Sequence, residues 1–178
     1  MYRIFLAFMV LLCSVQSFAK GADSEFGVLK KDNEKLLFAF DIKENGKKVF
    51  IGADADGKYI VYRSGTKNKV ELQYPEALNE LSWNKFKYSS YHKNGGAKND
   101  TVGDSYLSFN NKMIQYEVYE NWHYEDGLSQ GELRKEVGLI LLVHGRVINE
   151  KAVQASKAGS LVYLPDEYKR YLVNEDDK

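Results

Sequence analysis

Turn dipeptides recur at short intervals along this chain, and their spacing constrains its fold more than any other feature. Asn45-Gly46, Asp56-Gly57 and Ser64-Gly65 each border a short apolar segment. Asn-Gly is the strongest two-residue signal for a hairpin, because both residues tolerate a positive φ. Short strands bounded by such turns are typical of an antiparallel meander. The chain also contains 13 Tyr and 2 Pro, a balance that favours strands.

The residue pattern within the segments agrees with strands. Val70, Leu72 and Tyr74 alternate with polar residues, which predicts a strand with one buried and one exposed face. Segment 137–143 is apolar at nearly every position, so we expect a strand buried on both faces there. Near the end of the chain, Pro165 and the acidic residues after it predict a short helix over 165–172.

These segments together predict a mainly β fold. The expected arrangement is an antiparallel meander that forms a barrel or a sandwich of about eight strands, with a short C-terminal helix. The sequence shows no internal repeat and no linker-like segment. Residues 20–178 are therefore predicted to form a single β-rich domain, long enough to bury a core of its own.

Residues 1–19 have the layout of a cleavable signal peptide. Arg3 supplies the positive charge, residues 4–12 form an apolar stretch too short to cross a membrane, and Ser17-Phe18-Ala19 is a small-x-small cleavage site. Cleavage after this site would release a mature chain that begins at Lys20. We therefore expect export to the periplasm, or secretion beyond it.

Charge and cysteine content exclude several classes of function. The chain has 25 basic and 25 acidic residues, so it lacks the positive excess of a general nucleic-acid binder or of a protein that docks on anionic lipid. Its one cysteine, Cys13, lies in the predicted signal, which leaves the mature chain without disulfides. An exported domain of this kind favours a bacterial protein over an extracellular eukaryotic one.

Three short motifs suggest chemistry, and each is incomplete. Gly103-Asp104-Ser105 resembles the nucleophile block of GDSL-type esterases, but the Asp-x-x-His that completes their triad is missing. Asp54-Ala55-Asp56-Gly57 resembles part of a calcium loop, yet Gly52 and Arg63 stand where an EF-hand needs its first and last ligands. His123 and the acids after it offer too few converging ligands for a metal. We predict no enzyme, cofactor or metal, although a pair of catalytic carboxylates stays open because their separation depends on the fold.

Aromatic side chains are the best candidates for a binding surface. Outward-facing Tyr and Trp supply contact area at protein interfaces, and they also stack on sugar rings. Alternation in segment 114–119 places Tyr116 inside and Tyr119 outside, and the polar segment 91–104 is predicted to be a loop that inserts into a partner. The alternative is that the rings only fill a β core. The candidate binding residues are Tyr91, His92, Lys93, Trp83, Tyr119 and Trp122.

The middle of the chain carries a recognisable set of segments. They are Lys58-Tyr59-Ile60-Val61-Tyr62-Arg63-Ser64-Gly65-Thr66-Lys67, Val70-Glu71-Leu72-Gln73-Tyr74-Pro75, Ser82-Trp83-Asn84-Lys85-Phe86, Asn94-Gly95-Gly96 and Leu107-Ser108-Phe109-Asn110-Asn111. Across roughly residues 58–120 the chain resembles a group of small exported bacterial proteins of uncharacterised function. This resemblance implies an exported, β-rich bacterial protein and transfers no functional residue. In layout the chain also resembles periplasmic lysozyme inhibitors, which are small β-barrels, although their Ser-Gly-x-x-Tyr motif is missing.

These observations favour a non-catalytic binding protein. We expect it to block a periplasmic protein partner, such as a toxin or a cell-wall hydrolase, in the manner of an immunity protein or an inhibitor. One alternative is a small-ligand or glycan binder with a pocket lined by Trp83, Trp122 and nearby Tyr. Another is a structural envelope protein without a discrete site. No nucleic-acid partner and no membrane span are predicted, and the sequence leaves the oligomeric state open.

Overall fold

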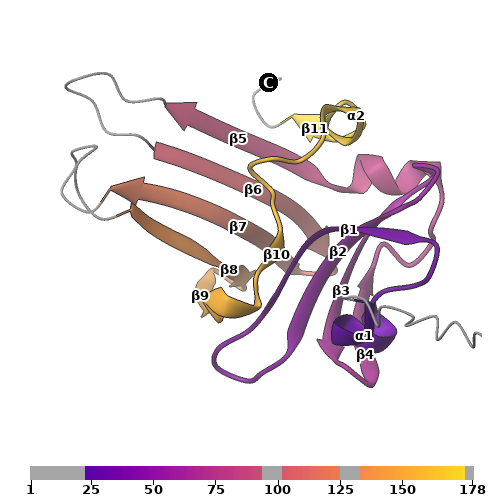
Figure 1. Ribbon diagram of the computed structural model, residues 1–178, viewed down its shortest axis with the longest axis horizontal. Helices are drawn as coiled ribbons and strands as arrows, with labels where there is room; N and C mark the ends of the chain where they lie inside the picture. The colour runs from indigo at the N-terminus through magenta and orange to yellow at the C-terminus, as the bar shows by residue number, and fades with distance from the viewer. Residues whose placement is uncertain (1–22, 94–101, 125–132, 175–178) are drawn as a thin grey trace, which may run out of the picture.

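The computed structural model describes residues 23–93, 102–124 and 133–174. The predicted signal peptide, 1–19, and most of the predicted inserting loop, 91–104, lie outside these ranges. The described residues form two β-sheets that face each other, with short helical turns at their margins (Figure 1). The mainly β fold predicted from the sequence is confirmed.

The first sheet combines the N-terminal half of the chain with one short strand from near the C-terminus, in the order β10-β1-β2-β3-β4. Gly46 and Gly57 lie in its first two hairpin turns with φ of 67° and 77°, a conformation that glycine adopts without strain. These two predicted turns are confirmed. The strands are β1 (Glu34–Asp41), β2 (Lys48–Asp54), β3 (Ile60–Thr66), β4 (Lys69–Tyr74) and β10 (Ala158–Gly159).

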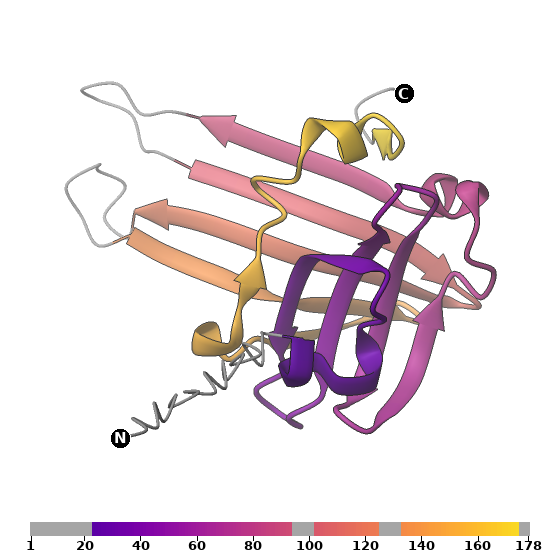
Figure 2. The same ribbon diagram turned by 45° about the vertical axis from the view of Figure 1, so that its right-hand side comes forward.

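The second sheet has the order β11-β5-β6-β7-β8-β9, and its neighbouring strands are antiparallel except for β11, which runs parallel to β5. Its strands are long, with 11 residues each in β7 and β8, and they extend past the first sheet (Figures 1 and 2). The strands are β5 (Lys87–Lys93), β6 (Val102–Asn111), β7 (Ile114–Tyr124), β8 (Leu133–Val143), β9 (Arg146–Lys151) and β11 (Val173–Asn174).

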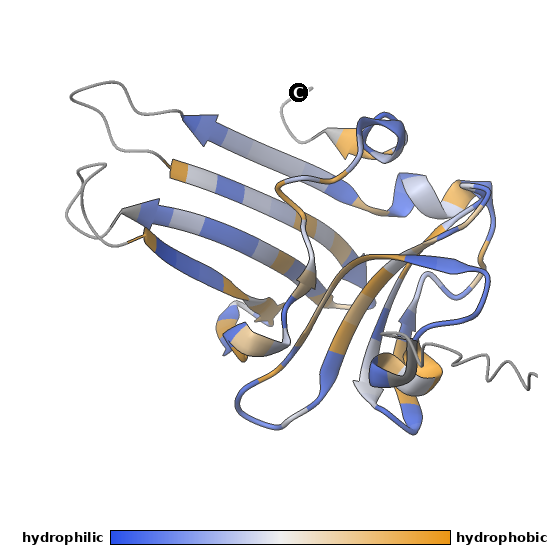
Figure 3. Cartoon of the chain, in the orientation of Figure 1, coloured by the Kyte–Doolittle hydropathy of each residue, from blue (hydrophilic) through white to orange (hydrophobic). Residues whose placement is uncertain are grey.

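The main core lies between the two sheets. Tyr62 of β3 packs against Phe109 and Tyr116 of the second sheet, with ring centroids 4.9 and 6.1 Å apart. A smaller core lies on the other face of the first sheet, where Phe26 packs against Phe50. Beyond the first sheet the free end of β5 is hydrophilic (Figure 3).

The helical turns lie at the margins of the two sheets. They are α1 (Asp23–Phe26), η1 (Gly27–Leu29), η2 (Glu80–Lys85), η3 (Gln154–Ser156) and α2 (Asp166–Lys169).

Three parts of the predicted architecture need correction. The strands form two sheets and do not close into the barrel that was one of the two predicted arrangements. The described residues contain eleven strands, more than the predicted eight, because the chain returns after β9 and adds a short strand to each sheet. The helix predicted over 165–172 is the single turn α2, and Val173 then joins β5.

Two local predictions were also wrong. Ser64-Gly65 lies within β3, and the turn falls at Lys67 and Asn68. The register between β3 and β4 shifts between Ser64 and Gly65, so this glycine marks a β-bulge, where a Cβ would lie 2.2 Å from the Lys69 carbonyl oxygen. Segment 137–143 is fully buried only in its first half, where Tyr119 lies over Gly138 on the outer face. Leu142, on the outer face of the second half, is 37% exposed.

Candidate functional site

A segment near the C-terminus crosses the part of the second sheet that extends beyond the first (Figures 1 and 2). We call residues 157–163 the strap. The strap leads from η3 through β10 towards α2. It lies over the face of β7 and β8 that is turned towards the first sheet, the face that also carries Tyr116 and Val118 of the core.

Glu120 of β7 holds the strap in place. Its Oε2 accepts hydrogen bonds from the Ser160 hydroxyl (2.8 Å) and from the backbone N–H groups of Leu161 (2.7 Å) and Val162 (3.2 Å). Its Oε1 forms an ion pair with Lys157. Glu120 is only 7% exposed, and each of its carboxylate oxygens has a partner, as a buried charge requires. One carboxylate therefore fixes both the position and the backbone conformation of the strap.

A groove of about 400 Å³ remains between the strap and the sheet. This volume is within the range of pockets that bind small molecules or single side chains of a partner. The walls combine apolar, aromatic and charged side chains, and Tyr163 on the strap is 81% exposed. The groove is lined by Glu120, Asn121, Trp122, Leu133, Lys135, Val137, Lys157, Gly159, Ser160, Val162 and Tyr163.

Trp122 provides a flat surface in this groove. It pairs across the sheet with Gly103 of β6, and a Cβ at position 103 would lie 2.2 Å from the indole Nε1. The glycine therefore gives the indole room to lie against the backbone of β6. His92 of β5 lies beyond it, with ring centroids 6.5 Å apart. The indole is half-buried and lies close to the β6 backbone, which leaves part of the ring available to stack against a ligand.

The two lysines of the groove differ in whether their charge is already paired. Lys157 is half-buried and paired with Glu120. Lys135 stands directly opposite Trp122 on β8, is exposed, and forms no ion pair with any residue that the structure describes. An ammonium group offers three hydrogen-bond donors. The groove thus places an uncommitted cation beside a flat aromatic surface.

The structure brings together only two of the six predicted binding residues, His92 and Trp122. Tyr91 is 58% exposed but belongs to the opposite face of β5, because alternation along this strand buries Tyr88 and turns His92 inwards. Lys93 shares the outer face with Tyr91. Trp83 is a core residue: it lies in η2, is 3% exposed and stacks on Tyr168 with centroids 5.6 Å apart.

Tyr119 occupies the outer face of β7, as predicted, but it is only 3% exposed. Its hydroxyl donates a hydrogen bond to the Asn149 side chain (3.0 Å) and lies over Gly138, where a Cβ would come within 2.5 Å of it. The missing side chain on β8 lets the ring lie flat against the sheet. Alternation therefore predicts the face of Tyr119 correctly and its exposure wrongly.

Among the described residues, the Ser and His side chains considered for catalysis do not form a complete triad. The Ser105 hydroxyl is buried, and its oxygen lies 3.0 Å from the Ser90 Oγ, which lies 3.3 Å from the Nε2 of His92. No carboxylate in the described ranges hydrogen-bonds to His92, so the group that orients the base of a triad is missing there. Across the same ranges no three His, Cys, Asp or Glu side chains are grouped to hold a metal. Glu125 and Asp126, which follow His123, lie outside the described residues.

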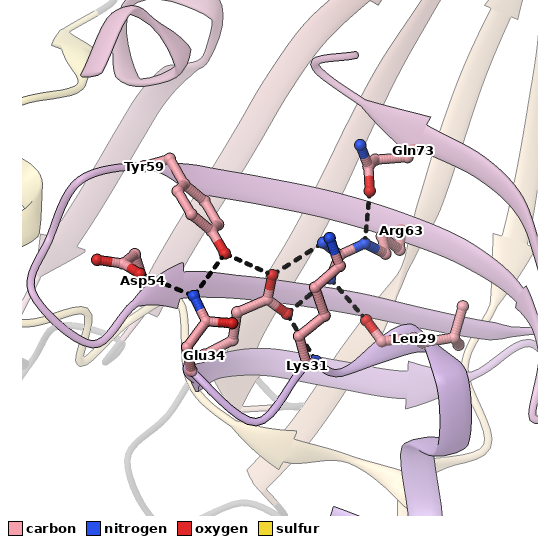
Figure 4. Close-up of polar contacts among 8 residues, drawn as sticks. Leu29, Lys31, Glu34, Asp54, Tyr59, Arg63 and Gln73 are labelled. Carbon is pink, nitrogen blue, oxygen red and sulfur yellow. Dashed lines mark hydrogen bonds and ion pairs between the residues drawn. The ribbon is translucent and has the colours of Figure 1, made fainter. Parts of the chain in front are cut away.

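The most strongly charged buried cluster lies on the opposite side of the molecule, under η1 (Figure 4). Arg63 donates to both carboxylate oxygens of Glu34, at 2.6 and 2.8 Å, and also to the Leu29 carbonyl (2.8 Å) and the Gln73 side chain (2.8 Å). Tyr59 adds a hydrogen bond to Glu34 at 3.1 Å. Both charged side chains are almost fully buried. Their hydrogen-bonding capacity is used within the protein, which indicates a structural role.

This pair makes stability depend on pH. Burial alone would raise the pKa of Glu34, but hydrogen bonds from Arg63 and from the Lys31 backbone N–H outweigh it and hold that pKa below its ordinary value of 4.5. A carboxylate whose pKa is lowered by folding stabilises the fold above its unfolded pKa, and this contribution is lost as the pH falls through the folded pKa. We expect the free energy of unfolding to fall more steeply below pH 4.5 in the wild type than in Glu34→Gln/Arg63→Met, which carries neither charge. Urea titrations on both sides of this pH measure the difference, and parallel profiles would contradict the assignment.

Several groove residues were not predicted from the sequence. They are spread over two strands and the strap, and the hydrogen-bonded partners are up to 42 positions apart in the sequence. These residues are Glu120, Lys135, Lys157, Ser160 and Tyr163. No local pattern connects them. The one available signal is the pairing of glycine with tryptophan in neighbouring strands, and it requires the register of β6 and β7.

No helix in the described ranges is both long and apolar enough to cross a membrane. Comparison of the chain with protein-family models, with curated proteins and with solved structures found no match. The groove geometry and the chemistry of its residues therefore carry the functional argument.

Proposed function

We propose that this chain is an exported, non-catalytic binding protein on a β-sandwich scaffold, and that the groove under the strap holds part of its partner. The observation that carries the proposal is the combination of the fixed indole of Trp122 with the open Lys135 ammonium in a groove of about 400 Å³. A preorganised aromatic surface binds without the entropic cost of ordering it first. The groove therefore suits the binding of part of a partner molecule.

The proposed partner is a protein, such as a toxin or a cell-wall hydrolase, which this chain blocks as an immunity protein or an inhibitor does. The groove has the volume to accept one or two side chains, and Tyr163 at 81% exposure adds an aromatic contact on its rim. Trp and Tyr around a pocket are typical of an interface hot spot, and Lys135 adds a positive charge beside them. A side chain with an apolar body and an acidic end fits the surface formed by Trp122 and Lys135.

A glycan is the second candidate, and the flat indole favours it specifically. Sugar rings present an apolar face that stacks on tryptophan, while their hydroxyl or carboxylate groups accept hydrogen bonds from an ammonium. Both candidates use the same groove. A binding screen with envelope proteins and envelope glycans in parallel separates them.

The test is an affinity pull-down from envelope extracts with the mature chain, Lys20–Lys178. We expect Trp122→Ala to weaken capture of the partner by at least about 30-fold, because it removes the central aromatic contact. The matched control is Tyr91→Ala, which removes a ring from the outer face of the same sheet and should leave capture unchanged. Equal capture by the Trp122 variant would overturn the groove as the binding site. Loss of capture in the Tyr91 variant alone would move the site to the outer face.

A further inference from the structure

The outer edge of the second sheet, β9, differs from the other sheet edges. β10 and β11 are two residues long, and β4 carries the charged residues Lys69 and Glu71 at exposed positions. β9 also carries charged residues, Arg146, Glu150 and Lys151, but they lie towards its ends. Its centre exposes Val147 (68%) and Ile148 (48%), one on each face of the sheet. Sheets protect their free edges with short strands or charges, because an unprotected edge pairs with another strand. The composition of β9 therefore indicates that another strand pairs with it.

The backbone pairing shows which groups of β9 are available. Ala152 donates its N–H to a carbonyl of β8 (2.9 Å), while the Lys151 carbonyl accepts a hydrogen bond from Lys43 on the opposite side (2.8 Å). Directions alternate along a strand, so Val147 and Asn149 also point their N–H and C=O groups away from β8. In the described ranges these main-chain groups have no partner. The Lys43 contact ends the free edge at residue 150.

The charges along this edge are complementary to themselves. Arg146 and Glu150 lie on one face of β9, on either side of Ile148. Arg146 is exposed and forms no ion pair with a described residue. Glu150 has one long hydrogen bond, from the Asn45 side chain (3.3 Å), and burial together with the nearby Glu44 carboxylate raises its pKa. The Lys47 ammonium lowers that pKa but is itself paired with Glu71, so Glu150 forms no ion pair with a described residue.

We propose that a second copy of this chain pairs with β9 in an antiparallel arrangement, with Ile148 opposite Ile148 on the two-fold axis. This register places Val147 opposite Asn149 of the second copy, so the outward main-chain groups of both residues pair with each other. It also places Arg146 opposite Glu150 on both sides of the axis. A shift by one residue opposes groups that point away from each other. A shift by two in one direction places Val147 opposite Lys151, whose carbonyl is already bonded, and in the other direction it places Asn149 opposite Gly145, which lies in the turn before β9.

Charge reversal tests this register directly. Arg146→Glu places two carboxylates opposite each other at both ends of the interface, and Glu150→Arg does the same with two cations. We expect each variant alone to raise the dimer dissociation constant at least about ten-fold. Mixing the two variants restores complementary pairs at both ends, as does Arg146→Glu/Glu150→Arg within one chain. Sedimentation equilibrium of the mature chain and of each mixture measures these constants.

Two further variants complete the test. Val147→Pro removes an N–H that points to the partner and not to β8, so the dimer should dissociate while the thermal unfolding profile of the monomer persists. Arg170→Glu, on the surface beyond α2, is the charge control and should leave the dimer dissociation constant unchanged. A wild-type chain that stays monomeric at all concentrations overturns the proposal. A dimer whose dissociation constant is unchanged by both charge reversals overturns this register.

Discussion

Replacing Arg63 with methionine is expected to lower the free energy of unfolding by about 3–5 kcal/mol, because it leaves a buried carboxylate without its cation. Glu34 has no exposed surface on its side chain, and Arg63 supplies its two shortest hydrogen bonds. The substitution also removes the donors that satisfy the Leu29 carbonyl and the Gln73 side chain. Methionine keeps much of the side-chain volume, so the loss reports charge and hydrogen bonding and not a cavity.

The double variant Glu34→Gln/Arg63→Met is the matched control for this prediction. Removing both members of a buried ion pair costs far less than removing one, so most of the lost stability should return. In Arg63→Met alone, we expect burial to outweigh the remaining hydrogen bonds from the Lys31 N–H and the Tyr59 hydroxyl, and so to raise the pKa of Glu34. The single variant should therefore recover stability as the pH falls towards 4.5, the reverse of the wild-type trend. Urea titration gives both results, and a double variant as unstable as the single one would contradict the assignment.

Replacing Glu120 with alanine is expected to cost about 2–4 kcal/mol, because it leaves several donors of the strap without an acceptor. The backbone N–H groups of Leu161 and Val162 lose their partner, and so do the Ser160 hydroxyl and the Lys157 ammonium. Glu120→Gln keeps one acceptor oxygen and should cost less. Amide hydrogen exchange at Leu161 and Val162 should be faster in both variants, and most so in the variant that loses more stability.

The control for this prediction is Glu136→Ala, an exposed carboxylate on the neighbouring strand β8. A surface change of this kind is expected to alter the free energy of unfolding by no more than about 0.5 kcal/mol. If Glu120→Ala changes the free energy of unfolding no more than this control does, the strap is held by its apolar contacts, and Glu120 does not anchor it.

Local patterns in the sequence predict the strands better than they predict the site. The hairpin turns at Gly46 and Gly57 follow from the conformational freedom of glycine and the apolar segments beside them. Gly65 carries the same local signal but lies in a β-bulge. A bulge and a turn both need a backbone conformation that residues with a side chain rarely adopt, so glycine marks either of them. Only the pairing with β4 distinguishes the two.

The exposure of aromatic residues depends on contacts that are distant in the sequence. Trp83 is buried because Tyr168 stacks on it from α2, and Tyr119 is buried because Gly138 leaves space on the next strand. Trp122 has a glycine neighbour as well, yet it lies beyond the first sheet and therefore lines a groove. Residue type and alternation are the same for core and groove rings, so the sequence alone does not separate them.

The placement of β10 has a consequence for the order of folding. β1 pairs with β2 through a short hairpin, but its other neighbour is β10, where Phe38 stands opposite Gly159. Bringing Gly159 to Phe38 closes a much longer loop than a hairpin does and costs more entropy, so we expect the hairpins to form first and the C-terminal segment to dock late. On this expectation the groove is assembled late in folding, on a surface already present on β7 and β8. Until the C-terminal segment arrives, Trp122 and Glu120 are open to any other strand, including that of a neighbouring chain.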